Sequence, residues 1–228
     1  MCLYEIQTTI PIIEIHVSCK NLASLDIGTK SDSLCLFETE QKGKYIEEDR
    51  TEVVFDNSNP NYVRSFKTYN LSDSNKQIRF EIYDYDPKNQ RNFELKDPIG
   101  YCITDIQYIA SHLNQPINFD LKKDSKNGKR GQITLIAHEY KQSNSNLQLI
   151  MQAMNLKKMK TFAKNNPFFE ISKPLENGHI ITLYRSEALL KCYSCTFLEF
   201  TIPINSLTSK SGDQITITFF DYHKNKPP

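Results

Sequence analysis

The chain has 228 residues, which is enough for one large domain or two modest ones. Its 28 basic and 27 acidic residues nearly cancel, so the charge gives no support to a nucleic-acid-binding protein. It has no apolar run near the roughly 18 residues of a membrane-spanning helix, no secretory leader pattern and no glycine-rich phosphate loop, so we expect neither a transmembrane segment nor a nucleotide site.

Short strands dominate the first half of the chain. Residues 10–17 alternate apolar and polar side chains, which is typical of a half-buried strand, and turn-rich stretches separate this segment from others of the same character. The predicted strands are 10–17, 34–37, 45–54, 62–71, 78–83, one starting near 98, 116–121 and 132–139. Eight such strands indicate an antiparallel β-sandwich.

A short helix is predicted between the sixth and seventh strands. Ile106, Ile109 and Leu113 are spaced so that they share one helical face. Thr104 is the expected N-cap, and Asp105 is expected in the first turn. This helix should cover one end of the sandwich.

The stretch FEIYDYDPKNQRNFELKDPIG, residues 80–100, gathers acidic side chains where a strand ends. Asp84 and Asp86 lie two residues apart on an extended backbone, so both carboxylates point the same way, and Asp97 closes the loop. Converging carboxylates repel one another unless a cation lies between them, and Ca²⁺ prefers such all-oxygen sites. Aspartate is also common in turns, so this stretch alone leaves a calcium site and an ordinary turn open.

Six cysteines are scattered along the chain. Cys192 and Cys195 form one CxxC pair, but no second pair or nearby histidine completes a zinc site, and no βαβ pattern frames a redox motif. We therefore expect free thiols.

The second half of the chain repeats the first. Three motif pairs recur at offsets of 134, 135 and 137 residues: Asn21-Leu22 with Asn155-Leu156, Arg50-Thr51-Glu52 with Arg185-Ser186-Glu187, and Tyr83-Asp84-Tyr85 with Phe220-Asp221-Tyr222. A near-constant offset of one domain length indicates an internal repeat. We predict two domains, at residues 1–141 and 142–228, with about five of the eight strands in the second.

These motifs resemble tandem C2 domains, and in particular the amino-terminal half of the copines. The segments that carry the resemblance are SCKNLASLDIGTKSD (18–32), EEDRTEVVFDNSNPNY (47–62), FEIYDYD (80–86) and, after a long gap, DPIG (97–100). The resemblance covers essentially the whole chain, without the von Willebrand A-type domain that copines carry. It implies an all-β fold of two tandem C2-type antiparallel eight-stranded β-sandwiches, the second incomplete at its C-terminus. An incomplete gene product, a fragment and a domain completed by a partner all remain open for that second copy.

In C2 domains, calcium lies between loops at one end of the sandwich. The resemblance implies that about two Ca²⁺ ions bind five aspartates of the first copy, two in its first loop and three in its third: Asp26, Asp32, Asp84, Asp86 and Asp97. One departure is Ser33, where the family usually has proline. This change affects entry into the strand more than ligation.

The second copy lacks most of this carboxylate set. Lys160, Asn166 and His223 stand at positions that match aspartates of the first copy, and only Asp221 is retained. A cation there would lose most of its ligand charge and meet a lysine ammonium group. We expect no calcium in the second copy.

The resemblance implies calcium-dependent binding to anionic phospholipid by a cytoplasmic protein that calcium recruits to the plasma membrane or another membrane. Ile27, Phe93 and Leu95, at the loop tips, are candidates for shallow insertion into the bilayer, with packing inside the long third loop as the alternative. A basic run in or beside the first loop of the second copy is either a contact for anionic lipid or a solvated loop: Lys157, Lys158, Lys160 and Lys164.

A calcium-independent protein-interaction or scaffold module is the competing hypothesis, and the degenerate second copy favours it. The complete aspartate set of the first copy argues against a purely scaffolding role. No catalysis is expected, because the chain has no GxSxG or HExxH motif and no kinase loop.

Overall fold

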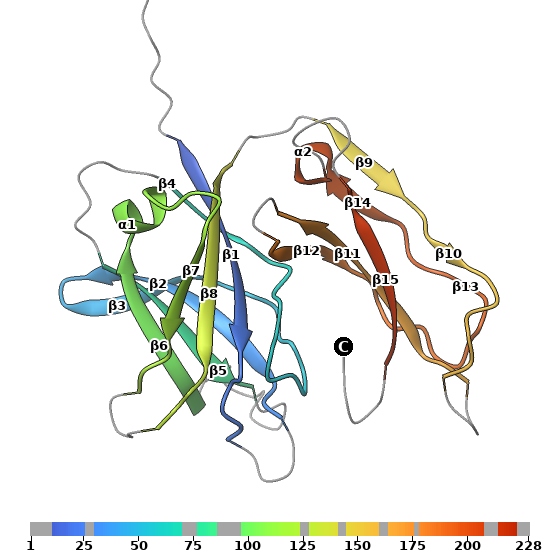
Figure 1. Cartoon of the computed structure of the whole chain (residues 1–228), viewed down its shortest axis with the longest axis horizontal. Coiled ribbons are helices and arrows are strands. Elements are labelled where there is room, and N and C mark those ends of the chain that lie inside the picture. The colour runs from blue at the N-terminus through green and yellow to red at the C-terminus, as the bar shows by residue number, and fades with distance from the viewer. Residues whose placement is uncertain are drawn as a thin grey trace, which may run out of the picture.

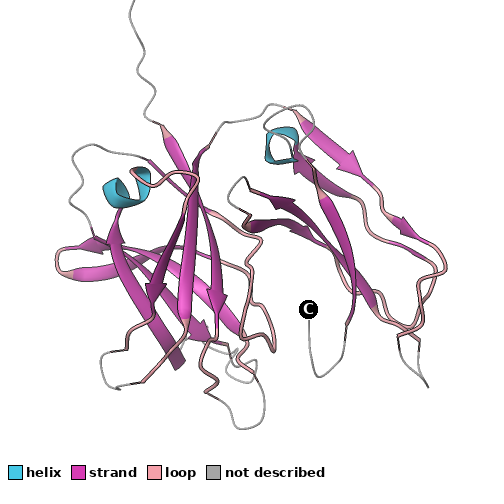
Figure 2. Ribbon diagram, in the orientation of Figure 1, coloured by secondary structure: helices cyan, strands magenta, loops and turns pink. Residues whose placement is uncertain are grey.

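The computed structural model describes residues 11–25, 30–69, 77–85, 97–123, 128–140, 145–159, 164–175, 178–207 and 214–222. Within these ranges the chain consists of antiparallel strands and two short helices, which confirms the predicted all-β class (Figures 1 and 2). No helix among the described residues is long and apolar enough to cross a bilayer.

The first sandwich contains two four-stranded sheets. One sheet has the spatial order β4 (Phe66–Tyr69), β1 (Ile12–Lys20), β8 (Gln132–Glu139) and β7 (Pro116–Asp120). The other has the order β3 (Lys44–Arg50), β2 (Ser33–Gln41), β5 (Gln77–Asp84) and β6 (Asp97–Asp105). All eight predicted strands are therefore present.

The segment between β3 and β4 is less regular than its alternation predicts. Both strands are shorter than expected, and residues 51–65 form a loop that side chains hold in place. The Glu52 carboxylate accepts hydrogen bonds from the backbone N–H groups of Val63 and Arg64, at 2.7 and 3.1 Å. These bonds replace the ladder that a longer strand would have provided.

The predicted helix is present as α1 (Ile106–Ala110), but its N-cap is Asp105, so the assignment of Thr104 as the cap is wrong. Asp105 has an extended backbone, and its Oδ1 accepts the Tyr108 N–H at 2.7 Å. Thr104 pairs with Ile78 in the β5–β6 ladder and is therefore still part of the strand.

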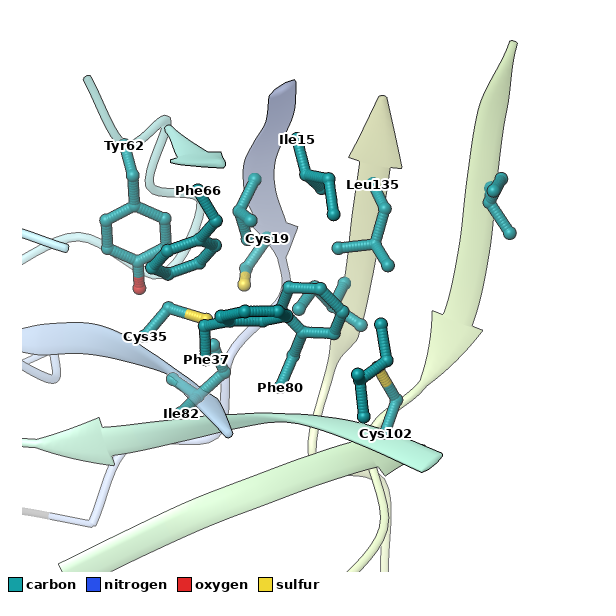
Figure 3. Close-up of a cluster of buried hydrophobic side chains, with 14 of the residues drawn as sticks. Ile15, Cys19, Cys35, Phe37, Tyr62, Phe66, Phe80, Ile82, Cys102 and Leu135 are labelled. Carbon is teal, nitrogen blue, oxygen red and sulfur yellow. The ribbon is translucent and has the colours of Figure 1, made fainter. Parts of the chain in front are cut away.

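Aromatic rings from both sheets meet at the centre of the first sandwich (Figure 3). The rings of Phe37, Phe66 and Phe80 lie with their centroids 5.3 to 5.9 Å apart, within the range of favourable aromatic pairs. All three side chains are buried. This cluster joins the two sheets into one core.

Three cysteines, Cys19, Cys35 and Cys102, lie in the same core (Figure 3). Burial raises the pKa of each thiol, that of Cys102 to about 12, so they pack as neutral apolar groups. The half-buried Cys195 also has a pKa raised to about 12, by burial and by its neighbour Cys192. The expectation of free thiols is confirmed for these five described cysteines.

The second half of the chain folds around a smaller core. One sheet has the order β12 (Ile180–Arg185), β11 (Pro167–Pro174) and β15 (Thr216–Asp221). Against it lie two short pairs and one helix: β9 (Asn146–Leu149) with β14 (Phe200–Pro203), β10 (Gln152–Ala153) with β13 (Cys195–Thr196), and α2 (Ile204–Leu207). Among the described residues, this half has counterparts of β1 to β5 but none of β6 to β8.

The two halves use the same side-chain hydrogen bonds to hold their strands. In the first, the Thr51 hydroxyl accepts the backbone N–H of Cys35 at 2.9 Å. In the second, the Ser186 hydroxyl accepts the N–H of Phe169, also at 2.9 Å. Each hydroxyl also donates to the carbonyl of the residue that follows it. The internal repeat therefore extends from sequence motifs to individual bonds.

A histidine pair lies on the outer face of the sheet that contains β1 and β8. Glu14 is paired with His138 across these strands, and the His16 ring lies 5.3 Å from the His138 ring, centroid to centroid. The pKa of His16 is lowered to about 4, mainly because the ring is removed from water; the Glu14 carboxylate opposes this shift, and the charges of His138 and Lys67 add to it. Burial also lowers the pKa of His138.

Equivalent core-facing positions of the two halves differ in how deeply they are buried. Ile78 in β5 is 1% exposed, whereas Ile215, at the same position of the repeat, is 43% exposed. We expect Ile78→Ala to lower the free energy of unfolding by about 2–5 kcal/mol. The matched change Ile215→Ala should cost less than about 1 kcal/mol, because much of that side chain is already in water. Denaturant unfolding of the full chain measures both values, and equal losses would contradict the difference in burial.

The histidine pair predicts a loss of stability in acid. The pKa of His16 in the folded chain, about 4, lies below the unfolded value, about 6.5. The unfolded chain therefore binds the extra proton first, and stability should fall as the pH drops from about 6.5 to 4, by about 1–3 kcal/mol for this group. His16→Gln should make unfolding less sensitive to pH in this window, with His112→Gln as the matched control. An unchanged profile in His16→Gln would refute the prediction.

Candidate functional site

Three chain segments meet at one end of the first sandwich. In the sheet register, Ser33 at the start of β2 pairs with Asp84 at the end of β5. Asp84 also pairs with Asp97 at the start of β6. Asp32 precedes Ser33, so the strand ends bring the first and third loops together.

A pair of hydrogen bonds fixes Asp32 against Asp84. The Asp84 Oδ1 accepts the backbone N–H of Asp32 at 2.8 Å, and the Tyr85 N–H donates to the Asp32 carbonyl at 2.7 Å. The Asp84 side chain is buried at this position. Its carboxylate is therefore held toward the first loop, where a second carboxylate lies.

The loop after β3 contributes a backbone donor to the same site. Asp32 Oδ1 accepts the Asp56 N–H at 2.8 Å, and Asp56 Oδ1 in turn accepts the Lys30 N–H at 3.0 Å. Asp56 has a left-handed backbone with φ of 42°, which non-glycine residues rarely adopt and which aspartate tolerates better than most. No role for Asp56 was predicted from the sequence, where its signal is the turn-rich segment DNSNP that it begins.

Ser33, where the resemblance leads one to expect proline, uses groups that proline lacks. Its N–H donates to the Val54 carbonyl at 2.9 Å, and its hydroxyl accepts the Tyr62 O–H at 2.9 Å. The departure therefore ties β2 more tightly to the loop that carries Asp56.

Of the five aspartates expected to bind calcium, the structure brings Asp32 and Asp84 together and pairs the backbone of Asp97 with Asp84. Six other predicted site residues lie outside the described residues: Asp26, Ile27, Asp86, Phe93, Leu95 and Lys160. Within the described ranges no three His, Cys, Asp or Glu side chains form a metal-binding group. Two carboxylates from separate loops are nevertheless the hard oxygen donors that suit Ca²⁺.

The second copy rebuilds the same arrangement with different chemistry. Asp221 Oδ1 accepts the Asn166 N–H at 2.7 Å, and the Tyr222 N–H donates to the Asn166 carbonyl at 2.7 Å. Lys191, with φ of 58°, donates its N–H to Asn166 Oδ1 at 2.9 Å, as Asp56 does in the first copy. The Asn166 amide nitrogen also donates to the Tyr222 carbonyl at 3.1 Å. A neutral amide that donates within the protein thus replaces the carboxylate.

Three of the four predicted lipid-contact lysines, Lys157, Lys158 and Lys164, are described, and all three are exposed. The buried Asn165 braces their loop, because its side chain donates to the Lys157 carbonyl at 2.7 Å and accepts the Met159 N–H at 3.0 Å. Asn165 was not predicted from the sequence as a site residue. The ammonium groups are therefore presented by a loop with a fixed backbone.

One arginine links the two halves of the chain. Arg185 donates through Nε to Glu170 at 2.7 Å, its Nη1 lies 3.4 Å from Glu52, and its Nη2 donates to the Asn61 carbonyl at 3.1 Å. A cleft of about 900 Å³ opens beside these groups, with Phe55 among its apolar lining residues. The guanidinium of Arg185 is paired with Glu170 and Glu52, and the surface that the cleft offers is mainly apolar.

The chain is similar to several known proteins. Nicotinic receptor-associated protein 1 of Caenorhabditis elegans is 27% identical over 239 residues, an alignment that covers 93% of this chain and 38% of that protein. The chain therefore spans less than half the length of this curated relative. Two similar solved structures are described as "Extended-Synaptotagmin 2, C2A- and C2B-domains, calcium bound" (13% identity, TM-score 0.44, 92% of this chain and 96% of that one) and "BON1-C2B" (19% identity, TM-score 0.42, 60% of this chain and 95% of that one).

The family comparison falls on the first sandwich. Residues 12–121 match the C2 domain family, a span that begins at β1 and ends just after β7. The strands, the sheet order and the loop end described above all lie within or beside this span. The chain contains a C2 domain.

Proposed function

We propose that the first sandwich is a calcium-dependent module for binding anionic phospholipid, of the kind found in copines. The observation that carries this proposal is the convergence of Asp32 and Asp84, which two loops hold together through a 2.8 Å bond between a backbone N–H and a carboxylate. About two Ca²⁺ ions would bind here, with these two carboxylates and three more as ligands: Asp26, Asp86 and Asp97.

The mechanism is an electrostatic switch. Without cations, a cluster of carboxylates at the loop end repels an anionic bilayer. Two Ca²⁺ ions add four positive charges at the same point, and their remaining coordination positions suit lipid phosphate or carboxylate oxygens. Ile27, Phe93 and Leu95 would add shallow apolar contacts. A near-neutral chain needs such a local change, because its overall charge does not attract it to a membrane.

The second copy would contribute without calcium. Its Asn166 side chain carries no charge, and its amide nitrogen donates a hydrogen bond to the Tyr222 carbonyl. A cation there would therefore lack the negatively charged ligands that it needs. The exposed lysines beside this loop favour a weak, calcium-independent contact with anionic lipid. The protein would then be a non-catalytic cytoplasmic protein that calcium recruits to membranes.

A scaffold function independent of calcium is the second candidate. The largely apolar cleft beside Arg185 favours it, because such a surface suits contact with another polypeptide. The two functions are compatible, since they use different surfaces of the chain.

The calcium proposal predicts different outcomes for two equivalent aspartates. Asp84→Asn should weaken Ca²⁺ binding by roughly tenfold or more, because it removes a charged ligand but keeps the oxygen that accepts the Asp32 N–H. Asp221→Asn, the matched change in the second copy, should leave calcium binding unaltered. Calorimetric titration of the full chain and co-sedimentation with phosphatidylserine vesicles, with calcium and with chelator, measure both effects.

Thermal unfolding of both variants in chelator provides the control for folding. Calcium-dependent sedimentation that survives Asp84→Asn at the wild-type level would exclude this site. An equal loss in Asp221→Asn would also contradict the proposal, since that copy is expected to bind no ion. If neither calcium nor vesicles bind the wild-type chain, the scaffold function becomes the better hypothesis.

The basic loop is tested in the absence of calcium. Replacing four lysines with alanine should reduce sedimentation with phosphatidylserine vesicles in chelator by roughly tenfold or more, because each lysine near an anionic surface contributes about 1 kcal/mol. The four are Lys157, Lys158, Lys160 and Lys164. The control removes the same charge from four exposed lysines of the first sandwich: Lys20, Lys44, Lys122 and Lys129. Equal effects of the two sets would show that only net charge matters.

A further inference from the structure

Two cysteines of the second copy, Cys192 and Cys195, lie in contact at the two ends of one surface turn. Both are partly exposed, whereas the other three described cysteines are buried in the core of the first sandwich. Removal from water raises the pKa of Cys195 to about 12, and a side-chain hydrogen bond with Cys192 adds to this shift. The two sulfur atoms therefore lie at hydrogen-bonding distance from each other.

The backbone of this turn is set by the repeat. The Tyr193 carbonyl accepts the Leu156 N–H at 2.8 Å. In the first copy, the equivalent Ser58 carbonyl accepts the Leu22 N–H at 2.9 Å. The turn of residues 192–195 is thus held in the same way as its counterpart 57–60.

The side chains at the ends of the turn differ between the copies. Asn57 and Pro60 stand in the first copy where the two cysteines stand in the second. Asn57 stabilises its turn locally, because its Oδ1 accepts the Asn59 N–H at 2.8 Å. Since the first copy makes the turn without any thiol, the fold does not require cysteine at either position. The occurrence of cysteine at both ends indicates a role for the pair.

Two thiols in contact can bind a soft metal ion or form a disulfide. A stable metal site in a protein needs further ligands. Within the described parts of the chain, no third His, Cys, Asp or Glu side chain joins the pair in a metal-binding group. The contact therefore favours a bond between the two sulfur atoms.

We propose that Cys192 and Cys195 form a reversible disulfide by exchange with a small anionic disulfide, of the class of oxidised glutathione. The exposed side chain of Lys191, directly before the first cysteine, favours an anionic reactant. Cys192 is the attacking thiol, because burial and the hydrogen bond keep Cys195 protonated.

The reaction has two steps. The Cys192 thiolate attacks one sulfur of the small disulfide, which forms a mixed disulfide and releases the first small thiol. Cys195 then loses its proton and attacks the Cys192 sulfur, which releases the second small thiol. Two protein thiols and one small disulfide thus become one protein disulfide and two small thiols, which carry away both protons.

The bond would close a loop of four residues, 192–195, and short loops gain the least stability from cross-linking. This disulfide is therefore suited to reversible oxidation more than to holding the fold together. It would join the residue next to Lys191, whose N–H donates to Asn166 Oδ1 at 2.9 Å, to the β13 residue that pairs with Ala153. The exchange needs neither calcium nor lipid, so its failure would leave the proposed function untouched.

The test is equilibration of the full chain at neutral pH with graded ratios of reduced to oxidised glutathione. Acid quenching, alkylation of free thiols and mass spectrometry of peptides then locate each bond. We expect the pair Cys192–Cys195 to become cross-linked while the core thiols stay reduced: Cys19, Cys35 and Cys102. The ratio of cross-linked to free chain should vary inversely with the square of the reduced glutathione concentration, because two small thiols are released.

Two single variants separate the steps. Cys195→Ser should stop at a mixed disulfide on Cys192, whereas Cys192→Ser should slow the modification of Cys195 by roughly tenfold or more, because its thiol is protonated. Circular dichroism of the wild type should be the same before and after oxidation. A pair that stays fully alkylated at the most oxidising ratio overturns the proposal, and so does a cross-link that forms only in denaturant. Equal rates in the two variants would overturn the assignment of Cys192 as the attacking thiol.

Discussion

The hydrogen bond from a backbone N–H to a carboxylate at the loop end is the interaction on which the candidate site depends. It holds Asp84 against Asp32 in the first copy and Asp221 against Asn166 in the second, at 2.8 and 2.7 Å. The chain retains it where the other acidic residues are lost, so its first role is structural: it fastens the first loop to the end of a core strand. Calcium binding requires the further carboxylates that only the first copy has.

The two copies show how little must change to separate two chemistries on one backbone. The same left-handed residue, Asp56 or Lys191, donates its N–H to the first-loop side chain in each. The side chain that accepts it is a carboxylate in one copy and an amide in the other. Since the Asn166 amide also donates to the Tyr222 carbonyl in the loop after β15, its hydrogen bonds are satisfied within the protein. The proposed difference in function therefore rests on a change of side chain at a position where the structural hydrogen bond is kept.

Alternation was sufficient to predict the eight strands of the first sandwich, whereas the meeting of Asp32 with Asp84 was expected only from the resemblance to C2 domains. It was not sufficient for contacts that depend on register or on rare backbone angles. The N-cap at Asp105 depends on where β6 stops pairing, and the part of Asp56 depends on a positive φ. The contact between the His16 and His138 rings requires the register of β1 against β8, which alternation leaves free by steps of two residues.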